Sequence, residues 1–230
     1  MASSDNAALL ANSALFVDLA PKGLEFLAEH ASRLDFERGR TIFQQGEQGE
    51  SLFVIAEGLV KVWVSSGDGG EMVLATLRTP DAFGELSAVD GRPRSASATA
   101  LEPTTLVALD RATLLDAVHR HPGVADGMMR ALGGLARRIT EQTSDLVFLD
   151  LGGRLAKALA ALADRDGRAE GDAIVLTLPL TQTELAEMVG GSRQSVNHIL
   201  RTFEDRGFLE IRGREVVISD LEGLRHRGSR

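Results

Sequence analysis

The hydrophobic residues in the first half of the chain come in short runs that are separated by glycine and other turn residues. The runs are Thr41–Phe43, Leu52–Ile55, Val60–Val64, Met72–Ala75 and Thr105–Ala108. Short strands at this spacing favour an all-β barrel or roll. A helical segment from about Pro21 to Ser32 is expected to precede it, with Phe16, Leu19, Leu24 and Leu27 packing on the roll.

A second pattern covers residues 122–149. Apolar positions recur at alternating steps of three and four, at Ala125, Met128, Leu132, Leu135, Ile139, Leu146 and Leu149, with Gln142 in the same register. Such a stripe is typical of the contact positions of a coiled coil. It predicts one long helix and a parallel homodimer formed through it. The alternative is an amphipathic helix that packs on its own domain.

The last third of the chain combines helices with a hairpin. Asp150 can cap a helix that runs past Leu162. A polar loop is expected at Asp164–Asp172, then a strand at Ile174–Leu178. Two further helices and an alternating hairpin at Leu209–Ile218 complete the pattern of a winged helix-turn-helix.

The two helices of this segment carry a DNA-reading pattern. Leu185, Ala186 and Val189 face inward from the first helix, and Gly190 or Gly191 can supply the positive φ of the turn. Ser192 can cap the second helix, whose outer face is Arg193, Gln194, Asn197, His198 and Arg201. Such a helix leads into the major groove with its N-terminal side chains.

Each of these side chains has an expected role. Arg193 and Gln194 should reach base edges, since arginine pairs with guanine and glutamine with adenine. His198 is expected at a base or a phosphate, and Ser192 and Arg201 at the DNA backbone. The alternative is a solvated face on a structural helix bundle. For Arg212 and Arg214 in the hairpin, phosphate contact and plain solvation are both open.

Composition narrows the class of protein. The 230 residues include no cysteine, which excludes disulfides, iron–sulfur clusters and thiolate nucleophiles. We find no apolar run long enough for a membrane helix, no secretory signal, no metal-ligand spacing, no haem ligand and no catalytic motif. We therefore expect a cytoplasmic protein that is not an enzyme and that contacts no membrane.

The charge is unevenly distributed. The net charge is −8, which is the wrong sign for a protein that coats nucleic acid. Residues 151–230 hold 12 basic and 12 acidic residues, whereas residues 1–150 hold the remaining 13 and 21. Any DNA contact must therefore use a local face of the C-terminal part.

A candidate ligand motif lies late in the expected roll. Phe83-Gly84-Glu85-Leu86-Ser87 is followed by Arg94-Ser95-Ala96. Gly84 allows close backbone approach, Glu85 can accept from a ribose hydroxyl, and Arg94 with Ser95 suits a phosphate. A short loop of backbone amides between them would complete a phosphate cassette. The alternative is a Glu–Arg surface pair in a β-turn.

Taken together, these motifs resemble the Crp/Fnr family of bacterial transcription regulators over essentially the whole chain. The resemblance rests on the glycine-marked roll, the Phe83–Ala96 cassette, the long helix, Phe148-Leu149-Asp150 and Gly191–Val196. It implies that Glu85 binds the ribose 2′-hydroxyl and that Arg94 and Ser95 bind the cyclic phosphate of a nucleotide such as cAMP. The resemblance also implies that the second helix of the helix-turn-helix docks in the major groove of DNA, as in this family.

Two departures from the family pattern concern specificity. Where the long helix usually offers a Thr-Ser pair to adenine, this chain has Ile139-Thr140, so Thr140 keeps only one hydroxyl. The recognition helix has Gln194 where the family often has Glu, and His198 where it often has a longer basic residue. Glutamine suits adenine and glutamate suits cytosine, so the operator is expected to differ.

The sequence thus predicts an α+β chain in three parts. Residues 1–121 form a cyclic-nucleotide-binding-like β-roll, residues 122–149 a long dimerisation helix, and residues 150–230 a winged helix-turn-helix. The expected ligand residues are Gly84, Glu85, Leu86, Ser87, Arg94, Ser95, Ala96 and Thr140.

The favoured function is a homodimeric, cAMP-controlled transcription regulator that binds a palindromic operator. RNA polymerase contact through Asp164–Asp172 is one reading of that loop, and plain solvation is the other. A ligand-independent or differently liganded regulator, or a regulatory subunit of a larger assembly, remains the alternative.

Overall fold

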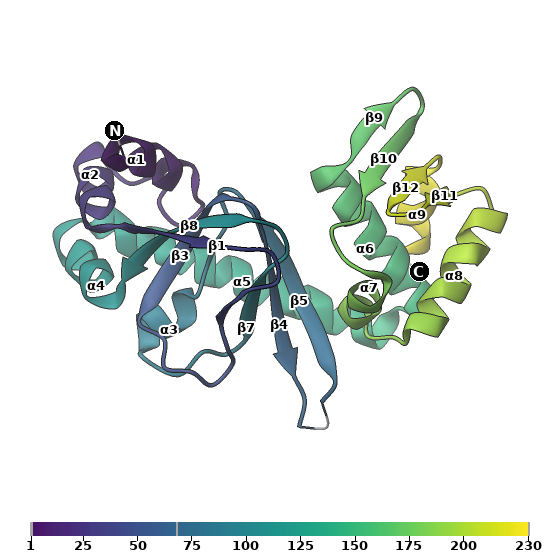
Figure 1. Cartoon of the computed structure of the whole chain (residues 1–230), viewed down its shortest axis with the longest axis horizontal. Helices are drawn as coiled ribbons and strands as arrows, with labels where there is room; N and C mark the ends of the chain where they lie inside the picture. Colours follow the sequence, from purple (N-terminus) through teal and green to yellow (C-terminus); the bar gives the residue numbers. More distant parts are fainter. Residues whose placement is uncertain (1, 68, 230) are drawn as a thin grey trace. The chain divides into compact units, whose positions relative to one another are not determined.

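A computed structural model describes residues 2–67 and 69–229 of the chain (Figure 1). The chain divides into two compact units, residues 1–137 and 138–230. The long helix α5 (Pro122–Phe148) belongs to both units, because the division falls inside it. Each unit is described by itself below.

The first unit is a β-roll with helices before it, after it and between two of its strands. The helices are α1 (Ala2–Asn12), α2 (Pro21–His30), α3 (Glu85–Asp90), α4 (Arg111–Arg120) and the start of α5. The strands are β1 (Ser32–Phe36), β2 (Thr41–Phe43), β3 (Ser51–Glu57), β4 (Leu59–Ser65), β5 (Glu71–Arg78), β6 (Ala82–Phe83), β7 (Ser97–Ala100) and β8 (Thr104–Asp110).

These strands form two antiparallel sheets that enclose an apolar core. The strand orders are β1-β8-β3-β6 and β2-β7-β4-β5. Phe53, Ile55, Val60, Phe83 and Leu106 are among the buried residues between the sheets. The expected β-roll is therefore confirmed, and the chain passes from β3 in one sheet to β4 in the other through a turn at Gly58 (φ 99°).

A second core joins the helices to the outer side of the roll. It holds Phe16, Leu19 and Leu27, which the sequence placed there, together with Val124 and Met128 of α5. A Cβ on Gly127 would lie 1.9 Å from the carbonyl oxygen of Leu15, so α5 approaches this segment closely. The first turns of α5 thus pack on their own domain.

The second unit is built around helix α6 (Leu151–Asp166). It also contains α7 (Gln182–Val189), α8 (Arg193–Asp205), α9 (Leu221–Arg227), β9 (Arg168–Glu170), β10 (Ala173–Thr177), β11 (Leu209–Arg212) and β12 (Glu215–Ile218). The strands form one antiparallel sheet in the order β11-β12-β10-β9. Helices α6, α7 and α8 share a core that includes Leu155, Leu185, Leu200 and Phe203. This is the expected winged helix-turn-helix.

Several local expectations were wrong. Residues 164–172 are not a loop, because α6 continues to Asp166 and β9 pairs with β10 across Gly171 (φ 61°). The segment after Gly84 begins as the helix α3 rather than as a loop. The lead-in helix ends at His30, and Ser32 opens strand β1. Strand pairing decides two of these segments, since β9 pairs with its neighbour β10 and β1 pairs with the distant β8.

The long helix is present as expected, from Pro122 to Phe148. Met128 is only 8% exposed and packs on its own domain, as the alternative interpretation of the stripe proposed. Further along, Ile139 is 53% and Leu146 is 48% exposed. The alternative interpretation therefore holds for the start of the helix, and the dimer through its later part stays a prediction.

Candidate functional site

The turn between α7 and α8 is fixed by caps at each helix end. Thr181 and Glu184 form a capping box, in which the Glu184 amide donates to Thr181 Oγ1 (3.2 Å) and the Thr181 amide to Glu184 Oε2 (2.9 Å). Gly190 ends α7 with φ 68°, which makes it the glycine that supplies the left-handed turn. Ser192 caps α8 by accepting from the Ser195 amide at 3.1 Å.

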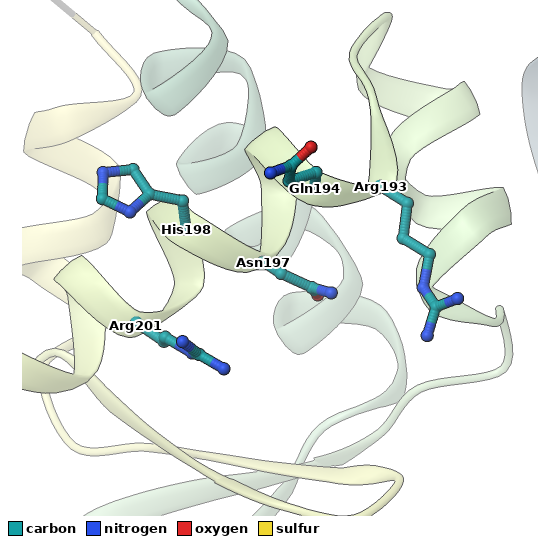
Figure 2. Close-up of a pocket in the computed structure, with 5 residues that line it drawn as sticks. All are labelled: Arg193, Gln194, Asn197, His198 and Arg201. Carbon is teal, nitrogen blue, oxygen red and sulfur yellow. The ribbon is translucent and has the colours of Figure 1, made fainter.

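The exposed face of α8 carries the five side chains expected to read DNA. Figure 2 shows Arg193, Asn197 and Arg201 pointing to one side of the helix axis, with Gln194 and His198 pointing to the other. All five line one open hollow on the surface, and Asn197 alone among them is half-buried. Spacings of four along a helix produce such rows. The arrangement offers guanidinium, amide and imidazole donors side by side.

A buried apolar strip holds this face in place. Val196, Leu200 and Phe203 of α8 are buried against α6 and α7. A Cβ on Gly191 would lie 2.7 Å from Cδ1 of Leu151, so the turn packs directly on the start of α6. The orientation of the recognition face therefore depends on the core and not on the exposed side chains.

Arg154 of α6 is a positioning residue that the sequence did not reveal. Its Nε donates to the Val189 carbonyl (2.8 Å), and its Nη2 reaches the Gly190 carbonyl (3.5 Å). Its Nη1 donates to the Leu149 carbonyl just after α5 (2.8 Å). A cation satisfies carbonyl groups at helix ends well. One half-buried guanidinium thus joins the end of α5 to the helix-turn-helix.

For the arginines of the wing, the sequence left two roles open, contact with phosphate and plain solvation. Arg212 is paired within the protein, because its Nη2 donates to Glu210 Oε2 at 2.7 Å and its Nε to Oε1 at 3.0 Å. The hydrogen bond from Arg212 lowers the pKa of Glu210 and raises the pKa of Arg212. Arg214 is solvent-exposed. A phosphate would have to compete with Glu210 for Arg212.

In the first unit, Arg94 lies inside the roll and next to the turn at Gly84. It is only 6% exposed, and its Nη1 and Nη2 donate to the carbonyls of Gly84 (2.9 Å) and Ser51 (2.8 Å). Its Nε is buried and has no hydrogen-bond partner within residues 2–67 and 69–229. A buried cation with an unsatisfied donor suits an anionic ligand.

The electrostatics around Arg94 point the same way. Burial lowers the pKa of the Arg94 guanidinium, and the carboxylates of Glu85 and Glu47 partly oppose this. Gly84 has φ 78°, a conformation that suits glycine, and it stands at the N-cap of α3. Glu85 thus begins α3 beside the guanidinium, as the ligand motif requires.

The other expected ligand residues are distributed as follows. Ser87 and Ala96 are buried, Leu86 is half-buried and Ser95 is exposed, all in the first unit. Thr140 is exposed on α5 and lies beyond residue 137, where the first unit ends. The structure brings Gly84, Glu85 and Arg94 together, whereas the role of Thr140 stays a prediction.

Both sites lie in segments that match known protein families. Residues 33–121 match the family described as the cyclic nucleotide-binding domain, and residues 153–227 match the Crp-like helix-turn-helix domain. The CRP-like cAMP-activated global transcriptional regulator of Mycobacterium tuberculosis is 38% identical over 219 residues, which cover 95% of this chain and 98% of the relative. This chain belongs to the Crp/Fnr family of transcription regulators.

Solved structures agree with this assignment. The Thermus thermophilus catabolite activator protein is 30% identical, with a TM-score of 0.55 over 94% of this chain and 98% of that one. The c-di-GMP responsive global regulator CLP of Xanthomonas campestris shares the fold, with a TM-score of 0.77 at 21% identity over 86% of this chain and 99% of the other.

Membership of the family decides several open questions. The protein is a DNA-binding transcription regulator with a cyclic nucleotide-binding domain, and it is not an enzyme. The winged helix therefore has a DNA-binding role, and the alternative of a regulatory subunit in a larger assembly is set aside. Within the described residues, no group of three or more His, Asp and Glu side chains could hold a metal ion. No described helix is both long and apolar enough to cross a bilayer.

Proposed function

We propose that this regulator is a homodimer controlled by cAMP, which binds in the β-roll and favours the DNA-binding arrangement. Arg94 is the observation that carries the proposal, because a buried guanidinium whose Nε has no hydrogen-bond partner among the described residues is suited to a cyclic phosphate. The relative from Mycobacterium tuberculosis is named as cAMP-activated, which supports the choice of nucleotide. The ligand can act only if it prefers one arrangement of the protein.

The ligand contacts follow from the motif. Arg94 and Ser95 bind the cyclic phosphate, and Glu85 accepts from the ribose 2′-hydroxyl. Gly84, Leu86, Ser87 and Ala96 shape the surrounding wall. Thr140 offers one hydroxyl to the base from α5, where Ile139 replaces a second one. A weakened base contact makes discrimination between cAMP and cGMP the first property to measure.

The dimer forms along the C-terminal part of α5. Ile139 and Leu146 lie seven residues apart on one stripe and are about half exposed in the single chain. Two copies in parallel would cover both positions. Their recognition helices would then meet half-sites about one helical turn apart in a palindromic operator.

On the operator, Arg193 and Gln194 read base edges, and Asn197 and His198 extend the contact by a turn. Ser192 and Arg201 bind the DNA backbone. The protein acts on cytoplasmic DNA, and the exposed strand β9 is the place to test for contact with RNA polymerase.

Calorimetry tests the ligand directly. Titration of the wild type with cAMP, cGMP and c-di-GMP should give heat with cAMP, and Arg94→Ala should abolish it. Equal affinity in both proteins would overturn the assignment of the pocket.

A second candidate is a regulator that needs no ligand, with the roll as a dimer scaffold. It is favoured by the hydrogen bonds that Arg94 already makes to Gly84 and Ser51. Tight operator binding by the nucleotide-free protein, with no change when cAMP is added, would support this candidate.

A further inference from the structure

Arg94 lies against aromatic rings that are far from the ligand motif in the sequence. Its guanidinium carbon is 4.2 Å from the ring centroid of Phe43 on β2 and 5.5 Å from that of Phe53 on β3. Phe43, Phe53 and Phe83 also pack on one another, with ring centroids 5.4–5.9 Å apart. The aromatic cluster therefore forms one wall beside the cation.

A glycine lies directly beside the Arg94 side chain. A Cβ on Gly49 would lie 2.4 Å from Nε of Arg94 and 2.7 Å from its Cδ and Cζ. Gly49 is not among the residues with positive φ, so its backbone does not require glycine. The missing side chain at position 49 leaves room for the Arg94 side chain instead.

The orientation of the guanidinium follows from these neighbours. A cation–π contact uses the flat face of the group and leaves its N–H edge available. Two donors on that edge bind the carbonyls of Gly84 and Ser51, and the buried Nε has no partner in the described part of the chain. An anion with two oxygens would complete the set of acceptors.

We propose that Phe43 and Gly49 are positioning residues of the ligand site, which hold the Arg94 guanidinium so that its N–H edge meets a phosphodiester anion. The inference rests on the proposed cyclic-nucleotide function and deepens it. Phe43 acts on the ligand through Arg94, and Gly49 acts by leaving the space that Arg94 fills.

Gly49→Ala is the first test, because alanine is compatible with the backbone and changes only the space beside Arg94. It should weaken cAMP binding at least tenfold in calorimetry and approach the affinity of Arg94→Gln. Gly67→Ala is the matched control, since a Cβ there meets nothing within 4 Å and its φ is not positive. Unchanged affinity in Gly49→Ala would overturn the role of Gly49.

Phe43→Leu is the second test, because it keeps an apolar side chain and removes the aromatic face. A cation–π contact of this kind predicts a loss of affinity between about 2-fold and 30-fold. Phe43→Tyr should stay within about twofold of the wild type. In an Arg94→Gln background, Phe43→Leu should cause no further loss; the same loss in both backgrounds would show that Phe43 acts only on the fold.

Failure of the proposed function can be told apart from failure of the aromatic contact. In nitrogen-15 NMR, the Nε–H signal of Arg94 should carry a ring-current shift in the ligand-free wild type and in Phe43→Tyr, and lose it in Phe43→Leu. If no cyclic nucleotide binds the wild type, the ligand role of both residues falls with the proposed function. An Arg94 signal that Phe43→Leu leaves unmoved refutes the contact itself.

Discussion

Replacing Arg154 by methionine removes one guanidinium from the junction of three structural elements. The carbonyls of Leu149, Val189 and Gly190 lose their donors, at 2.8, 2.8 and 3.5 Å. Methionine keeps an unbranched side chain and much of the helix propensity of arginine. The substitution therefore changes the hydrogen bonds more than it changes the helix.

The expected loss of stability depends on the number of these hydrogen bonds and on their exposure to water. A hydrogen bond to a charged group contributes about 1.5–3 kcal/mol when it is well made. Two of the three distances are short, but the side chain is half-buried and water can reach the freed carbonyls in part. We therefore expect the DNA-binding domain to lose about 2–4 kcal/mol of stability.

Native-state hydrogen exchange measures this loss where it occurs. Protection at the buried amides of Leu185 and Leu200 should fall by a factor corresponding to that free energy. The single tryptophan, Trp63, lies in the β-roll, so its fluorescence in urea should report an unchanged sensor domain. Operator affinity should fall as well, because the turn at Gly190 loses its support.

Arg168→Met is the matched control, since Arg168 lies in the same unit on the exposed strand β9 and pairs with the exposed Glu170 at 3.4 Å. It should stay within about 0.5 kcal/mol of the wild type, as surface substitutions usually do. If Arg154→Met behaved like Arg168→Met, the three hydrogen bonds would not stabilise the helix-turn-helix and the reasoning would fail.

Three further outcomes are expected. Asp150→Ala removes a helix cap and should cost about 0.5–2 kcal/mol of stability at neutral pH. The Gly153 amide and the Arg227 guanidinium lower the pKa of Asp150. In acid titrations, the wild type should therefore lose its extra stability over the variant as the pH falls through that lowered pKa. Arg193→Ala should remove about 1–3 kcal/mol of base discrimination. Operator affinity and specificity that are unchanged in this variant would refute the assignment. Aspartate at both Ile139 and Leu146 should weaken the dimer by about 3 kcal/mol or more in sedimentation equilibrium; an unchanged dimer would locate the interface elsewhere.

The DNA-binding helices could be predicted from the sequence because their determinants are local. Gly190, Ser192 and the apolar positions Val196 and Leu200 lie within one short stretch, and the structure gives each the expected conformation or burial. The capping box at Thr181 is encoded equally locally, in its T-x-x-E spacing. Local patterns of this kind need no knowledge of the rest of the fold.

The strands that were missed depend on pairing with their neighbours in a sheet. Ser97–Ala100 contains only small residues and becomes β7 because it lies between β2 and β4. Arg168–Glu170 is fully exposed and is a strand only through its pairing with β10. Neither segment has an apolar alternation that periodicity could detect.

The environment of Arg94 is the clearest case of a site that spacing cannot show. Its motif predicted the arginine and Glu85, but the rings and carbonyls around the guanidinium come from β2, β3 and the turn at Gly84. The carbonyls of Ser51 and Gly84 are forty-three and ten residues from Arg94. The sequence identifies the charge, and the fold decides which groups surround it.

The distribution of charge bears on why two copies should be needed. Residues 151–230 carry no net charge, and Arg212 is already paired with Glu210. One recognition face therefore offers few cations to phosphate, and the electrostatic part of binding grows with each phosphate that is neutralised. When two faces are joined, the second half-site binds as an intramolecular event with a high effective concentration. In the proposed dimer, affinity for the operator would therefore come mainly from placing two recognition faces at the correct separation, and a ligand that shifts that separation would have a large effect on binding.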